Sequence, residues 1–175
     1  ARDLAGAFAV LVEKTEHGKG GKVYHLVNAG ETNWYEAARR LLAKIQYRKE
    51  VVAMREKMQA AHPNKSGLFD LKHGHGGIVD IEFIVQYLVL GHAHQHPALT
   101  GNIGNLALLK LAVQLSLIDE APATAAHAAY REFRRLQHAL RLQGDSYARV
   151  PWESVDRHTI AVRMLWQQVM QGDQI

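Results

Sequence analysis

The chain has 175 residues, of which 47% are apolar and 22% charged, a composition typical of a globular domain with a sizeable core. It contains no cysteine, which excludes disulfides and thiolate metal sites, and we expect a cytoplasmic protein. No apolar run reaches the roughly 20 residues needed to span a bilayer, and the N-terminus does not resemble a signal peptide. The net charge of +4 permits anionic ligands, but we expect neither nucleic-acid nor membrane binding.

The first strong helix signal covers residues 34–61, which contain neither glycine nor proline. Asn33 followed by Glu36 is typical of a helix start, and an amphipathic pattern at 3–14 predicts a shorter helix before it. The long helix is very basic, with Arg39, Arg40, Lys44, Arg48, Lys49, Arg55 and Lys57. This basic face is either solvated or directed toward phosphates or an acidic partner.

The stretch 69–86 combines a glycine-rich turn with a strongly apolar segment. The turn contains Gly74, Gly76 and Gly77 and follows Lys72. The apolar segment predicts a helix from about residue 78 to 93, whose first N–H groups point back at the turn. Two interpretations remain open, an anion site formed by the turn with Lys72, or a tight turn into a buried helix.

The helix at 78–93 is apolar on every side, which predicts that it is central and buried. It nevertheless carries Asp80 and Glu82. Two residues apart is roughly 200° around a helix, so these side chains do not share a face, and a catalytic carboxylate pair is not expected. Buried carboxylates need partners, and the candidates are Arg134 and Arg135 on a later helix.

The rest of the chain predicts three more helices, beginning near Asn102, at 119–143 and at 153–171, with a loop at 149–152 before the last. In the last helix we expect the inward side chains to be Ile160, Met164, Leu165 and Val169. The fold class is therefore all-α, an irregular bundle of about six helices. Five histidines form a cluster in the sequence and leave open a metal-binding alternative: His73, His75, His92, His94 and His96.

A family resemblance rests on three segments of this sequence. They are Val-Val-Ala-Met-Arg-Glu-Lys-Met at 51–58, Phe-Asp-Leu-Lys at 69–72 and Gly-Gly-Ile-Val-Asp-Ile-Glu-Phe-Ile-Val-Gln-Tyr-Leu-Val-Leu at 76–90. Together they resemble bacterial glutamine synthetase adenylyltransferase, the adenylylating and deadenylylating enzyme of nitrogen control. The resemblance covers about residues 34–170 and implies a helical domain at 31–175, after a divergent segment or linker at 1–30.

The resemblance implies that the parent enzyme transfers AMP from ATP, with Mg²⁺, to a tyrosine of glutamine synthetase under control of the PII signalling protein. The Gly-Ser and spaced aspartates of the nucleotidyltransferase domain are absent, so we expect no catalytic residue here and no activity of the fragment alone. It also implies that a loop of Lys72, Gly74, Gly76 and Gly77 faces the nucleotide held by the missing domain. The alternative is a non-catalytic module that docks glutamine synthetase or the PII protein.

Overall fold

The computed structural model describes residues 34–171, with side chains from residue 46 onward. Five α-helices account for most of this part: α2 (Trp34–Ala60), α3 (Ile78–His92), α4 (Asn105–Gln114), α5 (Glu120–Leu142) and α6 (Asp156–Trp166). Short 3₁₀ segments occur at Pro97–Thr100 and Trp152–Ser154, and a π-helical turn at Gln167–Gln171 follows α6. The mostly α-helical prediction is confirmed. The predicted helix at 3–14, the cap at Asn33, and the side chains of Arg39, Arg40 and Lys44 lie outside the described residues.

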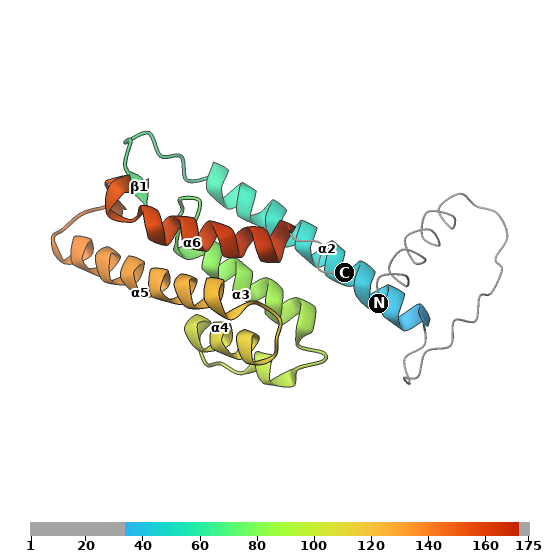
Figure 1. The fold of residues 1–175 in the computed structure, drawn as a ribbon. Coiled ribbons are helices and arrows are strands. Elements are labelled where there is room, and N and C mark those ends of the chain that lie inside the picture. Colours follow the sequence, from blue (N-terminus) through green and yellow to red (C-terminus); the bar gives the residue numbers. More distant parts are fainter. Residues whose placement is uncertain (1–33, 172–175) are drawn as a thin grey trace. The chain divides into compact units, whose positions relative to one another are not determined.

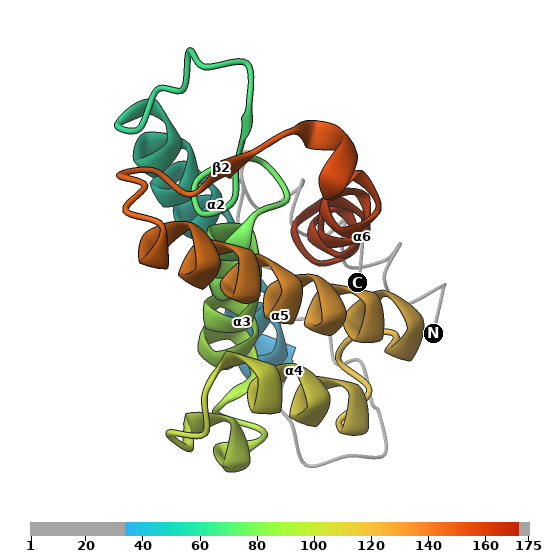
Figure 2. The ribbon, with the colours of Figure 1, turned by 90° about the vertical axis from the view of Figure 1, so that its left-hand side faces the viewer.

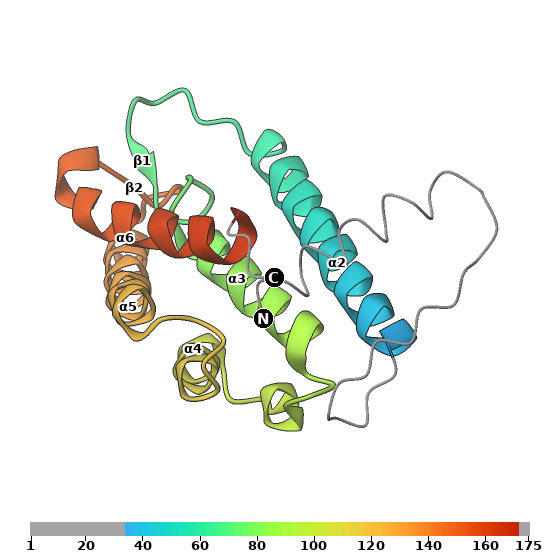
Figure 3. The same ribbon diagram turned by 45° about the vertical axis from the view of Figure 1, so that its right-hand side comes forward.

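The central position predicted for α3 is confirmed, because ten of its fifteen residues are buried. Figures 1 and 3 show α2 running alongside α3 in the opposite direction, while α4, α5 and α6 lie on its other sides. Ile81, Ile84 and Leu88 are almost entirely removed from solvent. A helix that is apolar all round is stable only when it is covered on every side, which these neighbours achieve.

Helices α5 and α6 form the most extensive helix–helix contact, and α4 packs below α5 (Figure 2). On α5 the buried residues Ala126, Tyr130 and Phe133 recur at the spacing of one helix face. The start of α4 differs from the expectation at Asn102. It begins at Asn105 after Gly104, whose φ of +80° is a conformation that asparagine adopts less readily than glycine.

The inward face of α6 is partly different from the prediction. Leu165 and Val169 are buried as expected, but Ile160 and Met164 are 50% and 59% exposed. The buried positions are instead Thr159, Val162 and Leu165, which keep a spacing of three residues. Thr159 on this face packs against the backbone at Gly76.

The predicted loop at 149–152 contains a strand that the sequence did not reveal. β1 (Phe69–Asp70) pairs antiparallel with β2 (Arg149–Val150), with Phe69 opposite Val150 and Asp70 opposite Arg149. Leu71 extends the pairing by donating its N–H to the Ala148 carbonyl at 2.9 Å. This two-residue ladder fixes the start of the glycine turn against the segment that leads into α6.

In the described part of the chain no helix combines the length and apolarity that crossing a membrane requires. The described residues from 40 to 171 belong to one compact unit, and the turn between β1 and α3 lies entirely within it. The boundary predicted at residues 30/31 falls outside the described residues and stays a prediction.

Candidate functional site

The glycine turn between β1 and α3 has a backbone that only glycine allows. Gly76 has a φ of +84°, and a Cβ placed there would lie 2.6 Å from both the Thr159 carbonyl oxygen and its Cγ2 atom. A Cβ on Gly77 would lie 2.7 Å from the Leu71 carbonyl oxygen. The turn is therefore packed tightly between β1 and α6, and Gly76 is required for both its conformation and its lack of a side chain.

Most backbone N–H groups of this turn are already engaged within the chain. Seven of them donate to oxygens of the protein itself: Lys72, His73, Gly74, Gly76, Gly77, Ile78 and Val79. At the start of α3, Ile78 donates to the Leu71 carbonyl at 2.9 Å and Val79 to that of Lys72 at 3.1 Å. A helix N-terminus binds a phosphate through free N–H groups, and these seven are not free, so an anion here would be held mainly by side chains.

Asp80, in the first turn of α3, holds the glycine turn through its carboxylate. One carboxylate oxygen accepts from the Gly76 N–H at 2.5 Å, and the other is paired with the guanidinium of Arg55 on α2. The Arg55 side chain is 2% exposed and also donates through Nη2 to the His73 carbonyl at 2.9 Å. Arg55 thereby joins α2, the turn and α3 in one buried network.

We expected Arg134 and Arg135 to pair with the carboxylates of α3. Asp80 is paired with Arg55 instead, whereas Arg134 does lie 3.9 Å from Glu82. Arg134 and Arg135 are both exposed on α5, and Arg135 forms its ion pair with Glu132 at 2.7 Å. The sequence did contain a signal for Arg55. It shares a helix face with the apolar Val51, Val52 and Met58, whereas the basic pattern of α2 as a whole suggests one continuous charged surface.

Glu82 lies in a different environment from Asp80, as their separation around α3 requires. Its carboxylate accepts from the Tyr130 hydroxyl at 3.2 Å, and Arg134 lies 3.9 Å away. The Glu82 side chain is 30% exposed and that of Arg134 is 54% exposed. This pair is therefore weak and solvent-screened, and it contributes little to the shape of the turn.

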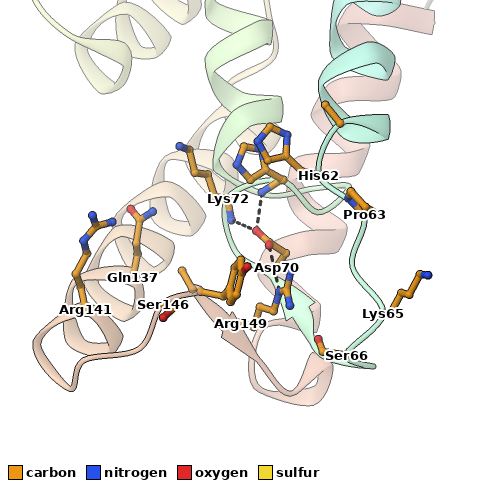
Figure 4. A pocket seen from close by; sticks show the side chains of 14 residues that line it. His62, Pro63, Lys65, Ser66, Asp70, Lys72, Gln137, Arg141, Ser146 and Arg149 are labelled. Atoms are coloured by element: carbon orange, nitrogen blue, oxygen red, sulfur yellow. Dashed lines mark hydrogen bonds and ion pairs between the residues drawn. The ribbon is translucent and has the colours of Figure 1, made fainter.

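Beside the turn lies a cavity of about 660 Å³ that we call the cationic cavity (Figure 4). Its wall is formed by the segment after α2, by β1 and the glycine turn, by the end of α5 and by the segment leading into β2. The basic side chains that line it are His62, Lys65, Lys72, His73, Arg141 and Arg149. The side chains of Lys65, Lys72 and Arg141 have no hydrogen bond or ion pair within residues 46–171, so the cavity carries unneutralised positive charge.

Asp70 is the single carboxylate lining this cavity among the described residues, and the chain already uses its oxygens. Oδ1 accepts from the backbone N–H groups of Lys72 at 3.0 Å and His73 at 2.8 Å, and Oδ2 lies 3.4 Å from Arg149 Nε. With Asp70 engaged in this way, its charge is compensated by Arg149 and the turn. It is not available to neutralise Lys72 or Arg141.

Two stacked imidazoles form one edge of the cationic cavity. The rings of His62 and His73 have centroids 3.8 Å apart and planes inclined by 6°. Burial, followed by the neighbouring His62, lowers the pKa of His73 below its usual value of 6.5. His73 Nδ1 is buried and has no partner among the described residues. At neutral pH the His73 ring is therefore uncharged.

Within residues 46–171 no three histidine or carboxylate side chains come together in a way that could hold a metal ion. The five histidines that cluster in the sequence are separated by the whole length of α3. His73 and His75 precede that helix, whereas His92, His94 and His96 lie at its other end. Their proximity in sequence is thus not a proximity in space.

Comparison with known proteins identifies relatives along most of the chain. Residues 35–173 match the family model described as GlnD PII-uridylyltransferase. A protein of Nitrosomonas europaea, called bifunctional glutamine synthetase adenylyltransferase/adenylyl-removing enzyme, is 50% identical over 139 residues, which are 71% of this chain and 15% of that protein. A protein of the same name from Bordetella bronchiseptica is 52% identical over 128 residues, 73% of this chain and 14% of that protein.

A third protein with this name, from Chromobacterium violaceum, is 46% identical over 149 residues, 82% of this chain and 16% of that protein. The chain thus spans about 15% of the length of the curated relatives that it matches. The family model is described by uridylyl transfer and these relatives are named for adenylyl transfer. Both descriptions concern the transfer of a nucleotide to a protein, and the relatives at about 50% identity are the more specific guide.

Proposed function

This chain belongs to the family of bifunctional glutamine synthetase adenylyltransferase/adenylyl-removing enzymes, and we propose that it is the helical part of an enzyme that transfers AMP from ATP to a tyrosine of glutamine synthetase. The other half of such an enzyme would reverse the modification, and the PII protein would regulate both activities in the cytoplasm. The observation that supports the proposal is the agreement in name among relatives at 46–52% identity over most of the chain.

Within this enzyme, we propose that Lys72 faces the phosphates of the nucleotide held by the neighbouring nucleotidyltransferase domain. Gly74, Gly76 and Gly77 would shape the turn that presents Lys72, while their own N–H groups remain bonded within the chain. The contact would therefore be made by the Lys72 ammonium group, which is exposed and has no partner among the described residues. An ammonium is a compact point charge that suits a phosphate oxygen.

The three carboxylates that the structure describes at the turn and on α3 do not fit a Mg²⁺ site. Mg²⁺ prefers carboxylate oxygens together with water and phosphate oxygens. Asp70 is engaged by Arg149 and two backbone N–H groups, Asp80 is buried against Arg55, and Glu82 lies on another face of α3. The carboxylates that would hold the metal belong, in this proposal, to the nucleotidyltransferase domain.

The proposal has a direct test with the chain alone. The 175-residue chain should incorporate no labelled AMP into glutamine synthetase when supplied with ATP and Mg²⁺. The full-length relative from Nitrosomonas europaea, assayed in parallel, provides the positive control. Labelling of glutamine synthetase by the chain alone would show that a complete catalytic site lies here.

The role of Lys72 is tested in the full-length enzyme, with the residue that corresponds to Lys72 changed to alanine. We expect a higher KM for ATP with an unaltered melting temperature, because an exposed lysine contributes little to folding. The matched control removes the exposed Lys110 of α4, which lies outside the cationic cavity. An ATP dependence that is the same in both variants and in the wild-type enzyme would remove Lys72 from the nucleotide site.

A docking module is the second candidate, favoured by one feature of α2. Tyr47 and Met54 stand seven residues apart, on one side of that helix, and are 38% and 59% exposed. Such a side could contact glutamine synthetase or the PII protein. Charged substitutions at Tyr47 and Met54 would then lower partner affinity without changing the KM for ATP, the reverse of the result expected at Lys72.

A further inference from the structure

The cationic cavity contains a row of hydrogen-bond donors with no acceptor to match among the described residues. In Figure 4, Gln137 stands between Lys72 and Arg141, to one side of the Asp70–Arg149 pair. The Gln137 amide oxygen accepts from Arg134 Nη1 at 3.2 Å, which leaves the Gln137 NH₂ group as a donor. Lys72 and Arg141 have no partner within residues 46–171. The row thus offers two full positive charges and an amide donor between them.

Beneath this row lies the Asp70–Arg149 ion pair, whose two charges are opposite and whose backbone is held in the β1–β2 ladder. Asp70 and Arg149 are held opposite each other in the β1–β2 ladder, and their side chains are 11% and 19% exposed. Because the Asp70 charge is compensated by Arg149 and two N–H groups, it repels an anion bound to the row less than a free carboxylate would. These residues belong to the hydrogen-bonded turn and to the last turns of α5, so the fold fixes their backbone positions around the cavity.

The size of the cavity selects among anions. At about 660 Å³ it lies within the range of roughly 300–1,000 Å³ that is usual for small-molecule sites. A single phosphate ion would leave most of this volume empty. A linear chain of phosphate groups presents a charge at each position, which matches charges that are separated by a neutral donor.

We propose that the cationic cavity is a complete binding site for a linear chain of two or three phosphates, held by Lys72, Gln137 and Arg141. Such a chain is supplied by a nucleotide or by inorganic polyphosphate. This inference rests on the proposed function and extends it, because there Lys72 supplies only part of a site shared with a missing domain. The cavity binds the phosphate chain without that domain.

The test uses the 175-residue chain and three probes: tripolyphosphate, ATP and inorganic phosphate. Affinity is measured by isothermal titration calorimetry, and the site is mapped by amide shifts in NMR spectra. Tripolyphosphate is expected to bind at least about tenfold more tightly than inorganic phosphate, because it engages both cations at once. The shifts are expected at residues 70–73, 137–141 and 146–149. Binding should weaken with added salt, since the donors are exposed.

The decisive variants are Lys72→Met, Arg141→Met and Gln137→Leu. Each charge removal is expected to weaken tripolyphosphate binding by about tenfold, in line with the loss of one charge-assisted hydrogen bond. The matched controls are Lys110→Met on α4 and Arg131→Met on α5, which remove the same charges from exposed positions outside the cavity. These controls should retain the wild-type affinity within a factor of about two. Circular dichroism melting verifies that every variant is folded.

Several results would overturn the inference. One is the absence of tripolyphosphate binding at millimolar concentration, and another is equal affinity for tripolyphosphate and inorganic phosphate. A third is an equal loss of affinity in the controls and the cavity variants, which would indicate attraction by net charge alone. Equal affinities for ATP and tripolyphosphate would support recognition of the phosphates only, and tighter ATP binding would support a nucleotide as the ligand.

The inference and the proposed function can fail separately. Binding of tripolyphosphate by the isolated chain, together with an unchanged KM for ATP in the full-length Lys72 variant, would support this site and remove Lys72 from the catalytic nucleotide. No binding by the isolated chain, together with a raised KM in the full-length variant, would support the shared site and overturn the complete one.

Discussion

The charged side chains on the two sides of the turn between β1 and α3 differ in whether they are paired. On the buried side Arg55 and Asp80 neutralise each other and bind three backbone groups of the turn, at His73, Gly74 and Gly76. On the side of the cationic cavity Lys72 and Arg141 have no partner within residues 46–171. A buried ion needs compensation because its desolvation costs several kcal/mol, whereas an exposed ion remains hydrated. The first pair therefore shapes the turn, and the second is available to a ligand.

The largest expected effect is the removal of the buried charge at Asp80. Asp80→Asn leaves the Arg55 guanidinium buried without a counter-ion, and we expect the free energy of unfolding to fall by about 3–5 kcal/mol. Urea denaturation of the chain measures this loss. The control Glu132→Gln breaks the exposed pair with Arg135 and should change the stability little. Equal losses in the two variants would contradict a structural role specific to Asp80.

The next effect concerns the backbone of the turn itself. Gly76→Ala places a methyl group against Thr159 at a φ of +84°, and we expect a loss of roughly 1–3 kcal/mol in the free energy of unfolding. Gly67→Ala is the matched control, because Gly67 has a similar φ of +72° but nothing within 4 Å of a Cβ. A larger loss at Gly76 than at Gly67 isolates the close contact with α6. Equal losses would assign the whole effect to the positive φ.

The third prediction concerns the effect of low pH on stability through His73, which contacts both the buried network and the cationic cavity. His73 accepts from Arg55 through its carbonyl, while its ring lines the cavity, and burial is the first cause of its lowered pKa. His127 and His158 also have a pKa lowered by burial. A histidine whose pKa is lower when folded stabilises the protein above its unfolded pKa. Stability should therefore decline as the pH falls from about 7.5 through 6.5 to 5.5.

Urea denaturation at these three pH values measures the decline, and His73→Gln should reduce its slope. The pKa of His73 itself is followed by NMR titration of the ring protons. Bound tripolyphosphate should raise that pKa, because an anion in the cavity favours the imidazolium form. A stability that rises on acidification would contradict the buried, neutral state of these rings.

The smallest expected effect is on the stability of the cavity variants. Lys72→Met combined with Arg141→Met should change the free energy of unfolding by no more than about 0.5 kcal/mol, because both residues are exposed and unpaired within residues 46–171. Chemical denaturation beside the Asp80→Asn variant gives the contrast directly. A loss comparable to that of Asp80→Asn would show that charge contributes equally to stability on the two sides of the turn.

The sequence was sufficient for the existence of the helices in the described residues and for the central position of α3, because apolar residues occur on every side of residues 78–90. It was not sufficient for the partner of Asp80. Arg55 lies 25 positions away. Its place on one helix face with Val51, Val52 and Met58 is the only local signal, and the many other basic residues of α2 obscure it. The cationic cavity was equally hidden. The sequence pointed to Lys72 because it precedes the glycine-rich turn. Gln137 and Arg141 line the same cavity only because α5 packs beside that turn.

The β1–β2 pair joins Asp70 to Arg149, two residues that are 79 positions apart. All of α3, α4 and α5 lie between them, so closing this pair confines a long stretch of chain, whereas each helix forms from neighbours in sequence. We therefore expect the helices to assemble before the two strands meet. The two walls of the cationic cavity at 70–73 and 146–149 would then come together only in the final stage of folding. A chain arrested before that stage would be largely helical and unable to bind its anion.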